Sequence, residues 1–265
     1  GGTGPYTFSG SPVSNLSGTE RIYEQAAGAT TSYTVTDNLG CSGSASATAP
    51  TGHPTDIPYA GTTGSVTVDC YQKNFNKWVT YRDGNNDAIL SLQDNNQDLG
   101  TVTVTVYRDG AEPVAFSNDS ASTCTGFDDL KAMKRHFRVT SSAAQPFASN
   151  VGVRLYFSNA ELSSLITAST GNNVSGDICT GNDDVTSIND LYVTKYSGNF
   201  EDNDYNNNDA AGIYKVYGDN NAYNTTDGAL TKSSGGFSTL FNGGQSHHYV
   251  ELNVDRFSEF WLHGS

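Results

Sequence analysis

Short stretches in which polar and apolar residues alternate recur along most of the chain. Clear examples are residues 33–36, 65–69, 101–107, 192–196, 213–217 and 249–254, and residues 153–157 are a more apolar case. Alternation with a period of two predicts a half-buried β-strand, because successive side chains of a strand point to opposite faces of its sheet. Many such strands at short intervals predict an all-β chain with sandwich or jelly-roll-like packing.

The charge balance limits the partners of the chain. It has 28 acidic and 14 basic residues, which gives a net charge of −14 at pH 7. Nucleic acid and anionic membrane surfaces repel so acidic a chain, and we expect neither as a partner. The sequence contains no run of roughly 18 apolar residues, so we also expect no membrane insertion. Divalent cations are compatible with this charge.

A proline-rich segment indicates a domain boundary. Three prolines fall within residues 50–58. Segments of this composition are stiff and extended, and we interpret residues 50–64 as a linker. The linker separates a first module, residues 1–49, from a larger terminal β domain, residues 65–265.

One short helix is predicted within the terminal domain. The sequence Ser-Asn-Ala-Glu at 158–161 is a capping box, in which the serine and the glutamate each satisfy a backbone N–H at the start of a helix. Leu162, Leu165 and Ile166 follow at spacings that place them on one helical face. We expect this helix to cover part of the sandwich.

The order of motifs in the first module resembles a known repeat. The motifs are GGTGPY (1–6), an AAGAT turn (26–30), a YTVTD strand (33–37) and a closing NLGC (38–41). The order is similar to the SprB-type repeat in the giant surface adhesins of gliding Bacteroidota. The resemblance implies an extracellular, Ig-like β-sandwich spacer exported by the type IX secretion system. That repeat has further strands upstream, which we expect preceding chain or a neighbouring subunit to supply.

Segments of the terminal domain resemble a β domain that precedes the type IX sorting signal in Bacteroidota surface proteins. The segments are KWVTYRD (77–83), NNQDLG (95–100), VRLYFSNAEL (153–162), DLYVTKYSG (190–198) and FSEFWL (257–262). In that family a sorting domain follows the last motif and is removed at export. The resemblance therefore implies a mature end near residue 265, and it implies no catalytic residues.

The acidic segment 199–209 contains the candidate metal ligands. Asp202, Asp204 and Asn206 alternate along it and Asn208 follows, so that every second side chain could converge on one ion. Ca²⁺ takes roughly six to eight such oxygen ligands. The pattern is not an EF-hand, because its sixth and twelfth positions lack the required Gly and Glu. A solvated acidic loop is the alternative interpretation.

The sequence shows no enzyme motif. It has no Gly-x-Ser-x-Gly nucleophile elbow. His247 and His248 are neighbours beside an expected strand, where they would point to opposite faces, and we interpret them as surface residues rather than metal ligands. We expect no catalytic site and no enzymatic activity.

Aromatic residues are numerous, with 15 Tyr, 12 Phe and 2 Trp. Their rings can stack on the apolar faces of sugars. We expect most of them, including Trp78 and Trp261, to fill a core. Tyr205, Tyr214 and Tyr217 lie close to the acidic segment and are the candidates for ligand binding.

The four cysteines, at 41, 70, 124 and 179, include no C-x-x-C pair, so a zinc site is not expected. An even number in an exported chain is compatible with disulfides. We predict a Cys124–Cys179 bridge, while Cys70 either pairs with one of these or stays reduced. Cys41 either pairs outside this chain or is buried as a small apolar group.

These observations lead us to expect a non-enzymatic extracellular protein on the outer cell surface of a gliding or predatory bacterium. It would be an adhesin, or the homo-oligomeric subunit of a filament- or hook-like appendage, and would attach to surface glycans or target cells. Ca²⁺ is the one cofactor that the sequence suggests. The alternative is a carbohydrate-binding accessory module of a secreted polysaccharide hydrolase.

Overall fold

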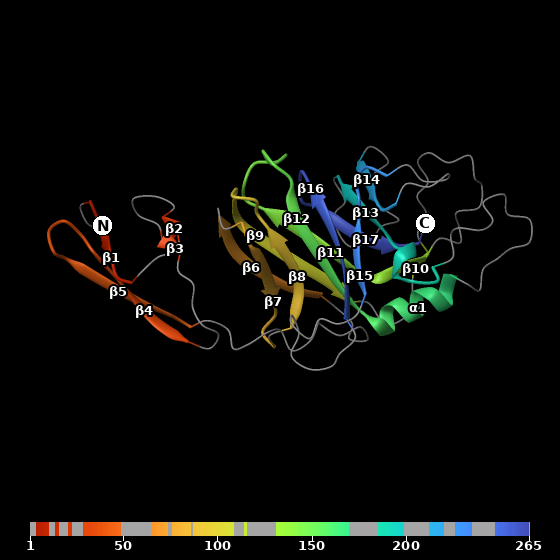
Figure 1. Cartoon of the computed structure of the whole chain (residues 1–265), viewed down its shortest axis with the longest axis horizontal. Helices are drawn as coiled ribbons and strands as arrows, with labels where there is room; N and C mark the ends of the chain where they lie inside the picture. The colour runs from red at the N-terminus through yellow and green to blue at the C-terminus, as the bar shows by residue number, and fades with distance from the viewer. Residues whose placement is uncertain are drawn as a thin grey trace, which may run out of the picture. The chain divides into compact units, whose positions relative to one another are not determined.

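A computed structural model of the chain divides into two compact units, Gly1–His53 and Pro54–Ser265. The residues that the structure describes are 4–10, 14–15, 21–22, 29–48, 65–73, 76–85, 87–108, 114–115, 131–169, 185–198, 212–219, 226–234 and 247–264. Most of the described residues of both units lie in antiparallel strands (Figure 1). The prediction of an all-β protein is confirmed.

The smaller unit contains two small sheets. One has the strand order β1 (Thr7–Phe8), β4 (Thr30–Thr36) and β5 (Ser42–Thr48), and the other pairs β2 (Ser14–Asn15) with β3 (Arg21–Ile22). The strand predicted at 33–36 lies within β4. All residues of β5 are exposed.

Hydroxyl pairs join β4 to β5 along the whole length of the hairpin. The oxygen–oxygen distances are 2.8 Å for Thr30–Thr48, 2.6 Å for Ser32–Ser46, 2.8 Å for Thr34–Ser44 and 2.8 Å for Thr36–Ser42. All of these side chains lie on one face, because each is two residues from the next. We call this set the hydroxyl ladder. Cross-strand hydroxyl pairs add to the stability of a β ladder.

The larger unit consists of two antiparallel sheets. The strand order of the first is β14 (Ile213–Tyr217), β13 (Tyr192–Ser197), β17 (Glu259–His263), β11 (Lys131–Ser141), β9 (Asp98–Arg108) and β6 (Ser65–Lys73), with β10 (Val114–Ala115) also paired to β11. The order of the second is β15 (Thr231–Ser234), β16 (His247–Val254), β12 (Val151–Ser158), β8 (Ala88–Gln93) and β7 (Trp78–Arg82). The remaining predicted strands all lie within these elements and are confirmed.

The consecutive strands β11 and β12 lie in different sheets, and so do the consecutive strands β16 and β17. β11 pairs with β17 in the seven-stranded sheet, and β12, which follows β11, pairs with β16 in the five-stranded sheet. The connection from β11 to β12 and the connection from β16 to β17 therefore cross between the two sheets at neighbouring positions.

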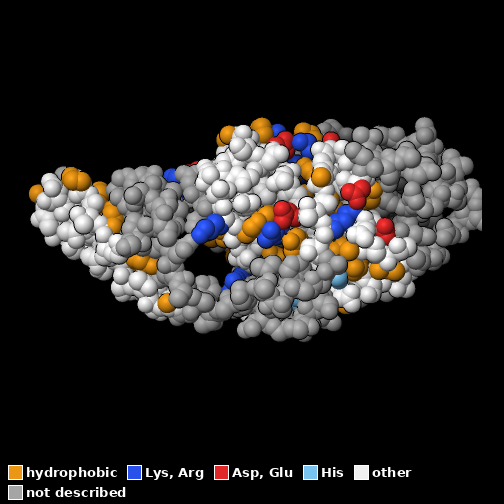
Figure 2. Space-filling model, in the orientation of Figure 1, with side chains coloured by type: hydrophobic (Ala, Val, Ile, Leu, Met, Phe, Trp, Pro, Cys, Tyr) orange, Lys and Arg blue, Asp and Glu red, His pale blue; other side chains and the backbone are white. Residues whose placement is uncertain are grey.

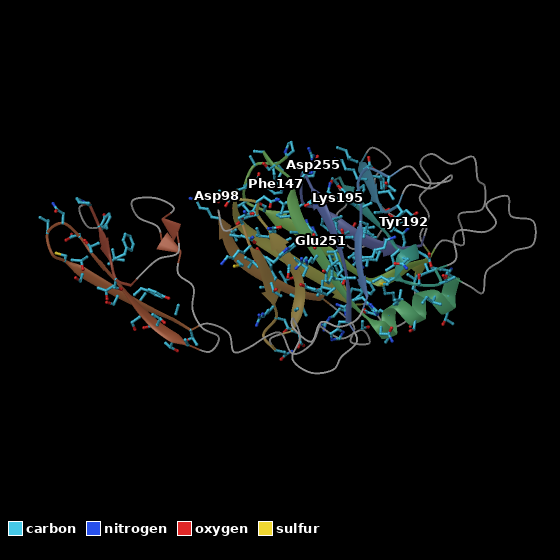
Figure 3. The ribbon with its side chains drawn as sticks, viewed as in Figure 1. Asp98, Phe147, Tyr192, Lys195, Glu251 and Asp255 are labelled. Carbon is cyan, nitrogen blue, oxygen red and sulfur yellow. The ribbon has the colours of Figure 1, made fainter. Side chains whose placement is uncertain are left out.

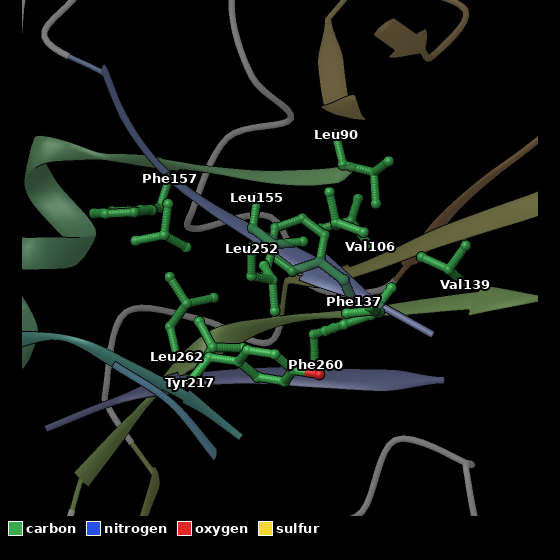
Figure 4. Packing of buried hydrophobic residues seen from close by; sticks show 14 of the residues in the cluster. Leu90, Val106, Phe137, Val139, Leu155, Phe157, Tyr217, Leu252, Phe260 and Leu262 are labelled. Atoms are coloured by element: carbon green, nitrogen blue, oxygen red, sulfur yellow. The ribbon is translucent and has the colours of Figure 1, made fainter. Parts of the chain in front are cut away.

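The core lies between the two sheets. Figure 4 shows Leu90, Leu155 and Leu252 of the five-stranded sheet packed close to Phe137 and Phe260 of the seven-stranded sheet. All of these side chains are at most 1% exposed. The larger unit is thus a two-layer β-sandwich held together by apolar burial, the dominant favourable term in folding.

The predicted helix is confirmed as α1 (Asn159–Ser169). The Ser158 side chain accepts a hydrogen bond from the Glu161 backbone N–H (3.1 Å), and the Glu161 carboxylate accepts one from the Ser158 N–H (2.8 Å). Leu162 and Leu165 are buried, and Ile166 packs against the core. The Glu161 carboxylate also lies 2.6 Å from Nε of Arg135 in β11, which ties the helix to the sandwich.

Candidate functional site

Several predicted site residues lie outside the described residues. They are the calcium candidates Asp202, Asp204, Asn206 and Asn208, the ligand candidate Tyr205, and the disulfide candidates Cys124 and Cys179. Elsewhere in the chain, the described residues contain no group of three or more His, Cys, Asp or Glu side chains that could hold a metal ion. The calcium and disulfide assignments stay predictions.

The two described tyrosine candidates do not form a common binding surface. Tyr217 is 4% exposed and belongs to the core, and its burial raises the pKa of its phenol (Figure 4). This burial contradicts the choice of Tyr217 as a candidate for ligand binding. Tyr214 is half-buried with its ring centroid 4.9 Å from that of Tyr196. It lies three residues from Tyr217 in the same strand, so the two side chains point to opposite faces.

The adjacent histidines also differ from the prediction. His247 and His248 are 4% and 7% exposed, so they are not surface residues. The His248 ring stacks on Phe157 at 5.4 Å, and its Nε2 lies 3.3 Å from Oδ1 of Asn159 at the start of α1. Burial, and secondly the nearby His247, lower the pKa of His248. His248 thus connects β16 to the start of α1.

The two described cysteines lie at the surface. Cys41 closes the hairpin turn between β4 and β5, where its backbone N–H donates to Oδ1 of Asp37 at 2.8 Å. It is exposed, so the alternative in which it is a buried apolar group is wrong. Cys70 lies in β6 and is also exposed.

A row of polar residues crosses the outer face of the five-stranded sheet, one from each strand. The register aligns Thr231 with Glu251, Glu251 with Arg154, Arg154 with Ser91, and Ser91 with Thr80. The residues on either side of Ser91, Arg154 and Glu251 belong to the core, so this polar row faces away from the other sheet. Four inter-strand spacings give it a length of about 19 Å.

Arg154 is the centre of the polar row and is held by three side chains. Its Nε donates to Oε2 of Glu251 at 2.8 Å, and its Cζ lies 3.7 Å from the ring centroid of Trp78 and 5.0 Å from that of Tyr249. Guanidinium groups are attracted to the faces of such rings. Glycine at 152 makes this stack possible, because a Cβ there would lie 2.9 Å from Cη2 of Trp78. Trp78 is half-buried on this face and does not belong to the core cluster, contrary to the prediction, whereas Trp261 is buried at 3% exposure.

A buried hydroxyl network supports one end of the polar row. Oγ of Ser91 lies 2.7 Å from the Tyr156 hydroxyl and 2.8 Å from Oγ1 of Thr80. Burial raises the pKa of Tyr156, so its phenol stays neutral and can act as donor or acceptor. These bonds fix β7, β8 and β12 relative to one another beneath the stack.

The stack leaves polar groups available at the surface. The side chains of Arg154 and Glu251 are 19% and 27% exposed. Among the described residues, none forms a hydrogen bond with the Nη groups of Arg154 or with Oε1 of Glu251. Figure 3 labels Glu251 near the middle of the sheet, where Figure 2 shows acidic, basic and hydrophobic side chains close together. Donors, acceptors and ring surfaces thus lie side by side in one place.

These four residues could not be grouped from the sequence. Trp78, Arg154, Tyr249 and Glu251 come from three strands that are far apart in the chain. A signal was present at Arg154, which alternates with apolar Val153 and Leu155 and is therefore directed outward. The cross-strand register that adds Glu251 and the two rings is a tertiary property. We call these four residues the Arg154 cluster.

His263 provides a pH-sensitive element elsewhere in this unit. Its Nε2 lies 2.8 Å from Oγ1 of Thr194, and its Nδ1 contacts the Gly264 carbonyl. Burial lowers the pKa of His263 to about 4, although the contact with the carbonyl acts in the opposite direction. The imidazole is therefore neutral in the folded protein near pH 7.

We expect the unfolding free energy to decrease as the pH falls from about 6.5 to about 4. Over this range the unfolded chain binds a proton at His263 that the folded chain does not bind, and the stability lost is of the order of 3 kcal/mol. Urea denaturation at several pH values would measure it. The His263→Asn variant should show a shallower dependence between these pH values, and an unchanged slope would contradict the assignment.

The fold and this surface together define an antiparallel β-sandwich with a polar, aromatic outer face. Comparisons of the chain with family models, curated proteins and solved structures found no match. Among the described residues, no helix is long and apolar enough to cross a membrane.

Proposed function

We propose that this chain is a non-enzymatic extracellular adhesion protein, an adhesin or appendage subunit, that contacts its target through the Arg154 cluster. The observation that carries the proposal is the stack of Trp78, Arg154 and Tyr249 on an outer sheet face. Trp, Tyr and Arg are the residue types that contribute most to binding energy at protein surfaces. A partly exposed stack whose Nη donors and Oε1 acceptor have no hydrogen-bond partner among the described residues has the composition of a contact site.

Two features of the sequence support an extracellular adhesin in particular. The first module resembles adhesin repeats, and the terminal domain resembles a β domain of exported surface proteins. The composition, with 16% charged residues and 28 glycines, suits a loop-rich β protein. In this proposal the smaller unit acts as a spacer and the larger unit makes the contact.

A glycan-binding accessory module of a secreted polysaccharide hydrolase is the second candidate. The observation that favours it is the pair formed by Arg154 and Glu251, which presents a donor and an acceptor beside two aromatic rings. The two candidates differ in what they hold. An adhesin retains whole cells or particles, whereas an accessory module retains the polymer that its partner enzyme degrades.

The proposed contact is tested by coating beads with the purified 1–265 chain and counting beads that stay on surfaces or bacterial cells under flow. We expect the Arg154→Ala variant to reduce retention by about tenfold or more, which corresponds to the loss of one important contact. Lys73→Ala is the matched control, because Lys73 is also a partly exposed member of an ion pair, with Asp98. Equal retention by both variants would contradict the proposed contact.

Calcium binding and self-association belong to the same proposal. Asp202, Asp204, Asn206 and Asn208 remain the proposed calcium ligands, and a homo-oligomer remains the proposed assembly. The mass of the native particle, measured with and without a calcium chelator, tests both. An oligomer that dissociates on chelation would support both proposals. A monomer whose stability is the same with and without the chelator would contradict both.

A further inference from the structure

The Arg154 cluster also indicates what kind of ligand it accepts. We infer that it binds a neutral, hydroxyl-rich sugar chain that lies along the polar row, rather than an acidic glycan or a charged peptide. This inference rests on the proposed function, because it uses the same surface. It adds the charge class, the orientation and the hydrogen-bonding groups of the ligand.

The ion pair gives the site a particular hydrogen-bonding character. Nε of Arg154 is already bonded to Oε2 of Glu251, so the remaining Nη donors and the remaining Oε1 acceptor lie next to each other. A vicinal diol of a sugar offers a complementary arrangement, since each hydroxyl can donate to the carboxylate or accept from the guanidinium. Bonds to charged groups are among the stronger hydrogen bonds. A lone carboxylate ligand would use only the arginine.

Charge favours a neutral ligand over an acidic one. Glu251 largely cancels the charge of Arg154 at 2.8 Å, so the cluster has little net attraction for an anion. The whole chain carries a net charge of −14, which repels uronic-acid polymers at long range. A neutral sugar needs no net attraction of charge at the cluster, and the net charge of the chain does not repel it.

The rings and the row agree with a sugar chain. Trp78 and Tyr249 are half-buried, so part of each ring is open to solvent beside Arg154. Flat ring surfaces suit the apolar faces of pyranoses. The exposed hydroxyl of Thr231 extends the polar row beyond Glu251. Ser91 is buried, so the open part of the row runs from Thr231 to Arg154 over two inter-strand spacings, or about 10 Å, which is longer than one sugar ring. The inferred ligand is therefore an oligosaccharide that crosses the strands.

The test is calorimetric titration of the purified 1–265 chain with two panels of hexasaccharides. One panel contains neutral chains of glucose, mannose and galactose, and the other contains galacturonate and mannuronate chains. Each titration is done at about 50 mM and about 300 mM NaCl, because salt screens charge-driven binding. We expect binding of at least one neutral chain, with a Kd that changes by less than about twofold between the two salt concentrations.

Variants assign the binding to the cluster. Glu251→Gln keeps the shape but alters the acceptor, and Arg154→Lys keeps the charge but loses the planar donor fork; each should weaken binding by about tenfold or more. Lys73→Ala should leave the Kd unchanged. The ligand should also change the tryptophan fluorescence of the wild-type chain, but not that of Trp78→Phe, in which Trp261 is the remaining tryptophan. Circular dichroism checks that every variant is folded.

The possible outcomes separate this inference from the proposed function. Stronger binding of the acidic panel, weakened by salt, would overturn the inference and leave a glycan adhesin in place. Retention of cells under flow that depends on Arg154, together with no hexasaccharide binding, would overturn the inference in favour of a protein target. If the chain shows neither sugar binding nor retention that depends on Arg154, the proposed function is overturned as well.

Discussion

Replacement of Glu161 by alanine is expected to lower the unfolding free energy of the larger unit by about 3–5 kcal/mol. The Arg135–Glu161 pair is buried, with side chains 0% and 9% exposed and 2.6 Å between Nε and Oε1. Removal of the carboxylate leaves the Arg135 cation in the interior without this counter-charge, and removing one partner of a buried ion pair is strongly destabilising. The variant also removes the capping interaction at Ser158, which is worth about 1 kcal/mol.

Urea denaturation followed by circular dichroism would measure this loss. Glu161→Gln is an informative second variant, because it keeps an acceptor for the cap while it removes the charge. Lys73→Ala is the control, since its ion pair with Asp98 is 22% and 47% exposed and should contribute at most about 1 kcal/mol. If Glu161→Ala and Lys73→Ala have the same small effect, the pair does not anchor the helix.

Replacement of Phe137 by alanine is expected to lower the unfolding free energy of the larger unit by about 3–5 kcal/mol. Phe137 is fully buried in the central strand β11, and its ring packs between the two sheets (Figure 4). The substitution removes most of an aromatic side chain and leaves a cavity that neighbours on two rigid sheets can fill only in part. The loss should appear in denaturation as a lower midpoint with an unchanged slope.

Ile213→Ala is the control for this second prediction. Ile213 is also apolar and also lies in a strand of the seven-stranded sheet, but it is 47% exposed. Its truncation should change the unfolding free energy by about 0.5 kcal/mol or less. Comparable losses at both positions would show that the core is not where the structure places it.

Local patterns were sufficient to predict the strands and the helix, but not which face of a strand is buried. In β14, Ile213, Lys215 and Tyr217 alternate with Tyr214 and Val216, so both faces carry apolar side chains. The sequence therefore leaves the choice of face open, and Tyr217, a candidate for ligand binding by its place in the sequence, is a core residue. By contrast, the helix α1 was predictable because a capping box and an apolar stripe are both local signals.

The Arg154 cluster could not be predicted from the sequence for a related reason. The acidic segment 199–209 could be predicted as a metal site because its carboxylates and amides are neighbours in the sequence. Arg154 and Glu251 are 97 residues apart, and only the pairing of β12 with β16 places them side by side. Register over such separations depends on the packing of the whole sandwich, so no short window of residues contains it.

The strand order of the smaller unit has a mechanical consequence. Thr7 of β1 lies opposite Thr36 of β4, at the end of β4 that the turn joins to β5, whereas Thr48 at the end of β5 lies opposite Thr30. A pull on β1 and on the end of β5 therefore acts at opposite ends of β4, and it loads the β1–β4 pairs in shear. Bonds loaded in this direction share the force, whereas bonds that are unzipped break one after another. For a protein proposed to hold a cell against drag, β1 is held along the more resistant direction.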